Sequence, residues 1–216
     1  MRIIVTGAAG ILGGAVARHL AKLGNEVIGF DIAERADDFP GTFIGSVDLT
    51  CETSAGAAVA QVGWPVQGLA CIAGGFVWET VRDGSVENWD RLYSMNVRTA
   101  LVACRAVLPA MSAGGSIVTI GAAATLKAGA GMGAYTASKS GVARLTEALA
   151  EELKGVVRVN AVLPSIIDTP ANRADMGEAD ADKWVAPLEL AKVIAFLLSG
   201  DASAVTGALI PVTGQV

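Results

Sequence analysis

Apolar residues gather in short, nearly continuous runs along this chain, and stretches with helical spacing separate these runs. Such runs predict strands that are buried on both faces, because half-exposed strands alternate apolar and polar positions instead. Seven runs of this kind occupy residues 2–6, 26–31, 42–47, 68–73, 116–120, 156–162 and 208–212. Between them, apolar positions three and four residues apart predict helices, the longest over about 85–111 and 135–153.

The alternation of strands and helices predicts an α/β fold, namely a doubly wound (Rossmann), mainly parallel seven-stranded sheet with helices on both faces. No repeat or linker interrupts the pattern, so residues 1–216 are expected to form a single domain. Pro211 places the last strand at an edge, because proline cannot donate a ladder hydrogen bond. The polar segment of about residues 171–186 is predicted to be a lid that excludes water from the site.

Local signals also predict where helices begin. Thr50 and Ser85 precede helical stretches and are expected to cap them, because a side-chain oxygen can accept from a free amide of the first turn. Pro187 is expected at the first position of the last helix, where a missing N–H costs nothing.

The first predicted strand runs into Thr6-Gly-Ala-Ala-Gly-Ile-Leu-Gly13, and a helix follows. Glycines at such a junction let backbone amides approach a pyrophosphate, whose charge the helix N-terminus stabilises. A glycine-rich turn without a ligand is the plainer alternative. The residues expected to contact the dinucleotide here are Gly7, Ala9, Gly10, Ile11 and Leu12.

Asp31 ends the second predicted strand, where a carboxylate can accept hydrogen bonds from ribose hydroxyls and would repel a 2′-phosphate. Asp31 therefore predicts that the protein prefers NAD(H), which lacks the 2′-phosphate, over NADP(H). Arg35 is a nearby cation that could complicate the preference.

Composition excludes several other classes. A formal net charge of −5 without a basic cluster argues against a nucleic-acid partner. Three cysteines and one histidine cannot supply a standard zinc set, so no metal is expected and the thiols are predicted to be reduced and mostly buried. No signal-peptide pattern or bilayer-length apolar run is found, which predicts a cytoplasmic protein with no membrane partner.

Tyr135 and Lys139 lie four residues apart and therefore on one face of a predicted helix. A fixed ammonium beside a phenol favours the phenolate, so this pair is a candidate proton donor to a developing alkoxide or enamide. A Tyr-x-x-x-Lys spacing is also common by chance, with the tyrosine half buried and the lysine in water.

Other polar or glycine positions follow the predicted strands. Asp48, the Gly74-Gly75 pair and the loop from Pro164 each come directly after a strand. Ligands of doubly wound sheets bind at the carboxyl ends of the strands, so these positions are expected to gather at one edge. Asn96 lies among apolar positions of the long predicted helix, where it is equally well interpreted as a satisfied buried amide.

In this order and spacing, the residues resemble the short-chain dehydrogenase/reductase family along nearly the whole chain. The matching positions are the Thr6-Gly7 turn, Asp31, Asp48, Ala73-Gly74, Asn96, Tyr135 with Lys139, and the loop from Pro164 to Thr169. The resemblance implies an NAD(P)-dependent oxidoreductase that acts on a small molecule.

The resemblance also implies roles for single residues. Tyr135 would be the proton donor or acceptor, Lys139 would lower its pKa and hold the nicotinamide ribose, and Asn96 would order a water that leads to Lys139. Further cofactor contacts are implied for Asp48, Leu49, Ala73, Gly74, Gly75, Pro164, Ile167 and Thr169.

Three departures from the family pattern are visible. The glycines follow Gly-x-x-Gly-x-x-Gly spacing, and Cys71-Ile-Ala-Gly74 replaces the usual Asn-Asn-Ala-Gly. The carbonyl-polarising serine of the family, thirteen residues before the tyrosine, is replaced by Ala122. Of the nearest hydroxyls, on Ser116, Thr119 and Thr125, only Thr125 is a credible substitute.

Within the family, the chain resembles the dihydropteridine reductases, which also lack that serine. The shared stretches are Cys-Ile-Ala-Gly-Gly, Ala122, Gly-Met-Gly-Ala-Tyr, Val-Leu-Pro-Ser-Ile-Ile-Asp-Thr-Pro-Ala-Asn-Arg and the segment from Met176 to Trp184. This implies hydride transfer from NADH to an activated conjugated C=N or C=O acceptor, such as a quinonoid dihydropterin. Such a flat acceptor would lie against residues 74–78, where Trp78 could stack on it.

Two alternatives remain open at this point: a general carbonyl reductase or alcohol dehydrogenase of the same family, and a non-catalytic dinucleotide-binding sensor. Self-association as a homodimer or homotetramer is also expected. The small residues Ala137, Ser138 and Gly141 would let another helix pack closely on the helix that carries Tyr135.

Overall fold

A seven-stranded sheet in the order β3-β2-β1-β4-β5-β6-β7 forms the centre of the computed structural model, which describes residues 1–34 and 38–216. All six neighbouring pairs are parallel. The strands are β1 (Arg2–Thr6), β2 (Glu26–Phe30), β3 (Thr42–Ile44), β4 (Val66–Cys71), β5 (Met111–Ile120), β6 (Val157–Pro164) and β7 (Leu209–Val212). The predicted doubly wound, seven-stranded parallel sheet in a single domain is therefore confirmed, including the edge position of Pro211 in β7.

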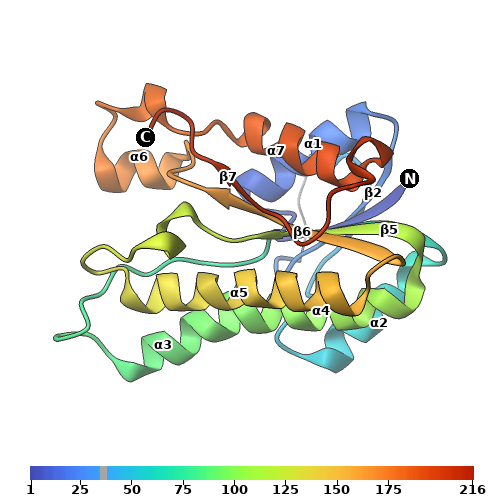
Figure 1. Ribbon diagram of the computed structural model, residues 1–216, viewed down its shortest axis with the longest axis horizontal. Helices are drawn as coiled ribbons and strands as arrows, with labels where there is room; N and C mark the ends of the chain where they lie inside the picture. The colour runs from blue at the N-terminus through green and yellow to red at the C-terminus, as the bar shows by residue number, and fades with distance from the viewer. Residues whose placement is uncertain (35–37) are drawn as a thin grey trace.

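Helices cover both faces of the sheet, as Figure 1 shows. The helices are α1 (Ile11–Lys22), α2 (Glu52–Val62), α3 (Val86–Tyr93), α4 (Thr99–Val107), α5 (Gly133–Glu152), α6 (Pro170–Met176) and α7 (Pro187–Leu198). On one face α1 packs against α7, and on the other lie α2, α4 and α5. Among the described residues, none of the helices is both long and apolar enough to cross a bilayer.

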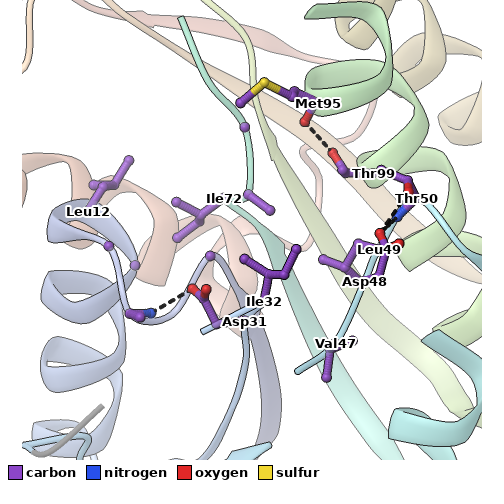
Figure 2. Close-up of a pocket in the computed structure, with 16 residues that line it drawn as sticks. Leu12, Asp31, Ile32, Val47, Asp48, Leu49, Thr50, Ile72, Met95 and Thr99 are labelled. Carbon is purple, nitrogen blue, oxygen red and sulfur yellow. Dashed lines mark hydrogen bonds between the residues drawn. The ribbon is translucent and has the colours of Figure 1, made fainter. Parts of the chain in front are cut away.

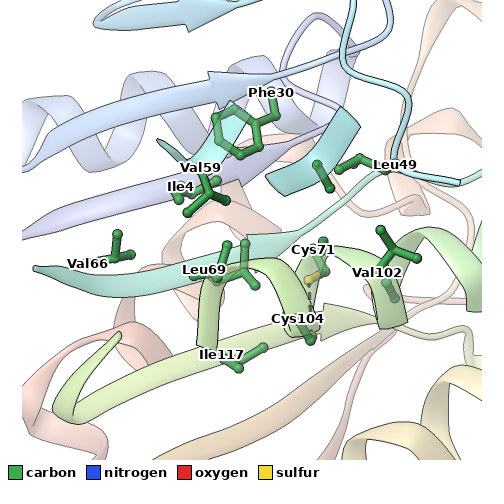
Figure 3. Packing of buried hydrophobic residues seen from close by; sticks show 14 of the residues in the cluster. Ile4, Phe30, Leu49, Val59, Val66, Leu69, Cys71, Val102, Cys104 and Ile117 are labelled. Atoms are coloured by element: carbon green, nitrogen blue, oxygen red, sulfur yellow. Dashed lines mark hydrogen bonds between the residues drawn. The ribbon is translucent and has the colours of Figure 1, made fainter. Parts of the chain in front are cut away.

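Each face has its own apolar core. Beneath α2 and α4, Phe30, Leu69 and Ile117 project from three strands, and they belong to the same buried cluster as helix residues such as Val102 (Figure 3). Cys71 and Cys104 belong to this core, with their Sγ atoms 3.9 Å apart. These two thiols are buried as predicted, whereas Cys51 is exposed.

The order of the strands reverses between β1 and β4, since the chain adds β2 and β3 on one side of β1 and the remaining strands on the other. The turn after β1 and the glycine pair after β4 therefore meet at the carboxyl edge of the sheet. Crevices at such a reversal are where doubly wound folds bind their ligands.

The helix predicted over 85–111 is wrong in its detail, because a π-helical segment, Ser94–Arg98, separates α3 from α4. A short 3-10 turn, Leu108–Ala110, follows α4, and β5 already begins at Met111. The Thr99 hydroxyl donates to the Met95 carbonyl oxygen at 2.7 Å, at the junction of the π segment and α4. A π turn adds one residue to a helical turn and leaves the apolar spacing on either side intact.

The two predicted helix caps have different outcomes. Ser85 caps α3, because its Oγ accepts from the Asn88 N–H at 3.2 Å. The cap predicted at Thr50 is wrong, since its hydroxyl donates to Asp48 at 2.7 Å, and α2 starts after Cys51 without a side-chain cap. Pro187 opens α7 as predicted.

The small-residue flank of α5 packs within the chain. A Cβ at Gly141 would lie 2.8 Å from Val97 Cγ2 of the π segment, and Ser138 bonds to Asn96 of the same segment. The reason given for self-association is therefore wrong for these two residues, because their close packing partner belongs to the same chain.

Candidate active site

The glycine turn after β1 lies directly against the end of β4. Gly7 has a φ of +65°, and a Cβ there would lie 2.8 Å from the backbone nitrogen of Ala73. A Cβ at Gly13 would overlap the carbonyl oxygen of Gly7. Only glycine fits at these two positions without moving the backbone, so the spacing seen in the sequence follows from close approach of the turn, α1 and β4.

Some backbone N–H groups of this turn already donate hydrogen bonds within the protein. The Ala9 N–H donates to Asp31 Oδ2 at 2.9 Å, and the Gly10 N–H donates to the Gly7 carbonyl oxygen at 3.1 Å. Helix α1 has no acidic residue in its first turn and no side-chain cap. Of the amides expected to meet a phosphate, those of Ile11 and Leu12 therefore remain available at the helix N-terminus, whereas that of Ala9 does not.

A cavity of about 610 Å³ opens beside this turn, and Figure 2 shows its lining. Nine of the predicted cofactor residues line it: Gly7, Ala9, Gly10, Leu12, Asp31, Asp48, Leu49, Ala73 and Gly74. It is also lined by residues that sequence reasoning missed: Gly13, Ile32, Val47, Thr50, Ile72, Met95 and Thr99. Several of these follow strand ends, which is the signal that could have identified them.

The other predicted site residues lie outside this cavity. They are Ile11, Gly75, Asn96, Tyr135, Lys139, Pro164, Ile167 and Thr169. The cavity thus covers one half of the predicted dinucleotide site, at β1, β2 and the β3–α2 connection, while the Tyr135 end is a separate cluster.

Two carboxylates face the cavity from neighbouring strand ends (Figure 2). Asp31 accepts from the Ala9 N–H through Oδ2 and from the Ala33 N–H through Oδ1, at 2.9 and 3.0 Å. Asp48 Oδ1 accepts from both the hydroxyl and the N–H of Thr50, which holds its pKa below the usual value. Arg35 lies outside the described residues, so its suggested influence on Asp31 stays a prediction.

The side chain of Asn96 is buried, with 1% of its surface exposed. Its Oδ1 accepts from the Gly75 N–H, and its Nδ2 donates to the Gly75 carbonyl oxygen and to Ser138 Oγ, each at 3.0 Å. The Ser138 hydroxyl in turn donates to the Tyr135 carbonyl oxygen at 2.7 Å. Asn96 therefore connects the loop after β4 with the first turns of α5, and both of its amide hydrogens are used within the protein.

Lys139 lies on the same helix and is also buried, with 6% exposed. Its Nζ donates to the Ile120 carbonyl oxygen at 2.9 Å, and no ion pair among the described residues includes it. Burial lowers the pKa of Lys139 to about 8. A Cβ at Gly74 would lie 2.5 Å from Asn96 Oδ1 and 3.4 Å from Lys139 Nζ, so the glycine allows these two side chains to meet beneath the loop.

The Tyr135 ring makes an edge-to-face contact with Phe76, with ring centroids 4.9 Å apart. Burial raises the pKa of Tyr135 to about 12. This direction is opposite to the one implied by the family resemblance, in which Lys139 lowers it. In the structure the Lys139 ammonium donates to Ile120, and desolvation of the phenol dominates.

Comparison with known proteins places this geometry in a family. A family model described as enoyl-(acyl carrier protein) reductase matches residues 7–214. The short-chain dehydrogenase/reductase cdmF of Talaromyces verruculosus is 32% identical over an alignment that covers 97% of this chain and 94% of that protein. The chain belongs to the short-chain dehydrogenase/reductase family. The predicted family is thereby confirmed, and members of this family are NAD(P)-dependent oxidoreductases, the enzyme class predicted for this chain.

Solved short-chain dehydrogenase/reductase structures agree over the whole chain. A glucose/ribitol dehydrogenase from Brucella melitensis is 30% identical, with a TM-score of 0.92 over 99% of this chain and 95% of the other. A short-chain dehydrogenase from Burkholderia cenocepacia, solved in complex with NADP, is 28% identical, with a TM-score of 0.89 over 99% and 96%.

Other relatives match over a shorter stretch. Two cyclopentanol dehydrogenases of Comamonas are 34% identical over 155 residues, which cover 66% of this chain and 62% of theirs. The chain thus matches less than two thirds of the length of these relatives. The resemblance to dihydropteridine reductases stays a prediction, because the relatives named here carry other activities in their names.

The place of the family's serine is filled by Ala122, which is buried with 4% exposed. The nearby hydroxyls are all used elsewhere. Thr125 Oγ1 donates to the Ala122 carbonyl oxygen at 2.8 Å, Ser116 Oγ donates to Leu197, and Thr119 bonds to Thr146. Thr125 is therefore bonded within its own 3-10 turn, which argues against it as a substitute for the serine.

The predicted lid contains α6 and a 3-10 turn, Ala181–Lys183. Thr169 caps α6 through the Asn172 N–H, and Asn172 Nδ2 donates to the Ile167 carbonyl oxygen at 2.7 Å. The four acids of this segment, Asp175, Glu178, Asp180 and Asp182, are exposed, as expected for a solvated face. Trp184 is buried instead, so the end of the segment is packed against the body of the protein.

Among residues 1–34 and 38–216, His, Cys, Asp and Glu side chains form no group of three or more that could hold a metal ion.

Replacement of Lys139 by Met should increase stability at neutral pH, because it removes a buried charge that pairs with no carboxylate among residues 1–34 and 38–216. The pKa of Lys139 falls from 10.5 to about 8 in the folded protein, so the unfolded chain binds more protons between these values. Below pH 8 the ammonium opposes folding, and Lys139→Met should raise the free energy of unfolding by roughly 1–3 kcal/mol at pH 7.

This gain should shrink as the pH rises from about 8 to about 10.5, because the native lysine is then already neutral. Urea denaturation at several pH values measures it, with Lys154→Met at an exposed site as the control. A Lys139→Met variant that is less stable than wild type at pH 7 would contradict the buried-charge interpretation.

Proposed function

We propose that this protein is an NAD(H)-dependent oxidoreductase that reduces an activated conjugated C=N or C=O acceptor, with Tyr135 as the proton donor. The observation that carries the proposal is the buried Ala122 beside an otherwise complete set of Tyr135, Lys139 and Asn96. A quinonoid dihydropteridine is a candidate acceptor, supported by the sequence resemblance.

The residues present fit a dinucleotide. The N–H groups of Ile11 and Leu12 at the start of α1 suit a pyrophosphate, and Asp31 has carboxylate lone pairs left for ribose hydroxyls. A cavity of about 610 Å³ beside them suits the adenosine half, with Asp48 and Leu49 in its wall. The nicotinamide half would lie toward Tyr135, with Gly74, Gly75, Pro164, Ile167 and Thr169 around it.

When bound, NADH supplies the hydride that reduces the acceptor carbon. The Tyr135 hydroxyl gives a proton to the acceptor nitrogen or oxygen, and solvent then restores that proton. Overall, acceptor, NADH and one proton become reduced acceptor and NAD⁺. A pKa of about 12 keeps Tyr135 protonated at neutral pH, which suits reduction rather than oxidation.

Lys139 has two tasks in this proposal. Its ammonium would hold the nicotinamide ribose, and it would favour the phenolate that forms as the proton leaves Tyr135. Asn96 would keep Lys139 and Tyr135 in place through Gly75 and Ser138. Its role in ordering a water that leads to Lys139 would have to use the free lone pair of Oδ1, since both amide hydrogens are bonded.

The alanine at 122 decides which acceptors suit the site. An unactivated ketone would lack one hydrogen bond to its developing oxyanion, and loss of one such donor costs about 2.7–4 kcal/mol. A quinonoid imine or a conjugated carbonyl is already electron-poor, so hydride delivery and one proton from Tyr135 suffice. The segment 171–186 is proposed as the lid that keeps water from this reaction.

A general carbonyl reductase or alcohol dehydrogenase is the second candidate. It is favoured by the relatives, two of which are cyclopentanol dehydrogenases. The two candidates differ in the acceptor, so substrates separate them. A homodimer or homotetramer remains a proposal.

The Tyr135→Phe variant should lose turnover by at least about a hundredfold with every acceptor, because it removes the donated proton but keeps the ring. NADH affinity should stay within about twofold, since the hydroxyl is not needed for the adenosine half. Steady-state rates with a quinonoid dihydropterin, an ortho-quinone and cyclohexanone measure this, each with NADH and NADPH.

Unchanged turnover in Tyr135→Phe would remove Tyr135 from the mechanism. Wild-type NADH binding without turnover of any acceptor would favour a non-catalytic sensor. Preference for cyclohexanone would favour the carbonyl reductase.

The Asp31→Asn variant should relax the preference for NADH, because it removes the negative charge that repels a 2′-phosphate and keeps one of the two oxygens that accept from Ala9 and Ala33. The ratio of kcat/KM for NADPH to that for NADH should rise by about tenfold or more. Asp175→Asn, at an exposed site in the lid, is the matched control. An equal ratio in Asp31→Asn and wild type would refute the role of Asp31.

A further inference from the structure

The loop after β4 carries two large aromatic side chains, of which Phe76 contacts the proposed proton donor and Trp78 lies against Gly131. Phe76 meets the Tyr135 ring edge to face, at an interplanar angle of 83°. Phe76 is 52% exposed and Trp78 is 61% exposed. Large apolar side chains that stay open next to a reactive group mark a surface that a ligand can cover.

Other segments hold the backbone on both sides of Phe76. Gly75 exchanges two hydrogen bonds with the Asn96 amide. The Glu79 N–H donates to the Gly131 carbonyl oxygen at 2.9 Å, and the Trp78 indole covers Gly131 so closely that a Cβ there would overlap it. The backbone that carries Phe76 and Trp78 is therefore held on both sides, at Gly75 and at Glu79.

The hydroxyls in this region offer little to a substrate. Ala122 has none, and the Thr125 and Ser138 hydroxyls donate to backbone carbonyl oxygens. The groups that remain exposed to a substrate are instead the aromatic rings of Phe76 and Trp78. Aromatic rings bind other flat π-systems in stacked or edge-to-face arrangements, and they discriminate poorly among small aliphatic groups.

We propose that Phe76 is a substrate-positioning residue whose ring, together with that of Trp78, holds a flat conjugated acceptor against Tyr135. The ligand class is a planar ring with delocalised electrons, such as an ortho-quinone or a quinonoid heterocycle. This inference rests on the proposed function, because it takes Tyr135 as the proton donor. It adds that ring contact orients the acceptor where the family's serine is absent.

The test compares two acceptors that share adjacent carbonyl groups: an ortho-quinone, which is flat, and an aliphatic α-diketone, which has no ring. Phe76→Leu should raise KM for the quinone by about threefold to tenfold, with kcat changed less than about twofold. KM for the diketone should stay within about twofold. Phe76→Tyr should restore the quinone KM, and Trp78→Leu should change it in the same direction as Phe76→Leu.

Trp64→Leu is the matched control, because Trp64 is also an exposed aromatic residue but precedes β4, at the opposite end of that strand. It should leave the quinone-to-diketone ratio of KM values unchanged. Equal KM changes for both acceptors in Phe76→Leu, or no change for either, would overturn the proposal.

Binding separates this inference from the proposed function. Quenching of tryptophan fluorescence gives the Kd of the ortho-quinone in the presence of NAD⁺, where no reduction can occur. If wild type binds the quinone more tightly than Phe76→Leu but reduces no acceptor, the proposed function fails and the aromatic site stands. If Tyr135→Phe abolishes turnover while Phe76→Leu binds quinone as wild type does, the function stands and the role of Phe76 is refuted.

Discussion

The buried side chain of Asn96 is the interaction on which the geometry of the catalytic cluster depends. An amide inside a protein must find partners for its oxygen and for both of its hydrogens, because each unbonded group costs free energy. Here the partners are the N–H and the carbonyl oxygen of Gly75 and the hydroxyl of Ser138. Ser138 in turn bonds to the Tyr135 carbonyl oxygen, so the loop after β4 and the start of α5 are fixed by one side chain.

A π-helical segment presents this amide. Its five residues, Ser94–Arg98, place Met95 in the wall of the cavity beside the glycine turn and Asn96 toward α5. Arg98 Nε donates to the Thr50 carbonyl oxygen at 2.7 Å, beside Asp48. The same irregular turn thus contacts both halves of the proposed cofactor site. Single π turns within α-helices frequently occur at functional sites, where they redirect side chains in this way.

The electrostatics of the cluster favour neutral groups. Burial raises the pKa of Tyr135 and lowers that of Lys139, and in both cases the uncharged form gains. A buried lysine whose ammonium donates to one carbonyl oxygen, and which pairs with no carboxylate in the described part of the chain, opposes folding at neutral pH. Its retention in such a place fits a functional role, since perturbed titratable groups concentrate at reactive sites.

The strand and helix pattern predicted most of the fold, because continuous apolar runs and Pro211 report burial and edge position directly. The π segment was missed, since one added residue leaves the apolar spacing of α3 and α4 intact. The cap at Thr50 was assigned wrongly for a different reason. The Thr50 hydroxyl bonds to Asp48, as the Ala9 N–H bonds to Asp31, and side-chain partners chosen by loop geometry cannot be inferred from local sequence.

For the candidate site too, the sequence predicted the positions that follow from the strand pattern and missed the contacts between distant segments. Residues on the strand ends, such as Asp31 and Gly74, were placed correctly at one edge of the sheet, because parallel strands bring their carboxyl ends together. The contact between Phe76 and Tyr135 could not be foreseen, since it joins a loop to the first turn of a helix that is far away in the chain. The same holds for the use of Gly141 and Ser138 in packing against the π segment.

The most direct measurement compares kcat/KM for cyclohexanone and for an ortho-quinone, in wild type and in Ala122→Ser. If the absent hydroxyl restricts the enzyme to activated acceptors, wild type should strongly favour the quinone. The serine should then raise the relative rate with cyclohexanone by about tenfold or more, because it restores one donor to the developing oxyanion. A wild-type enzyme that reduces cyclohexanone as well as the quinone, with a ratio unchanged in Ala122→Ser, would contradict the role assigned to Ala122.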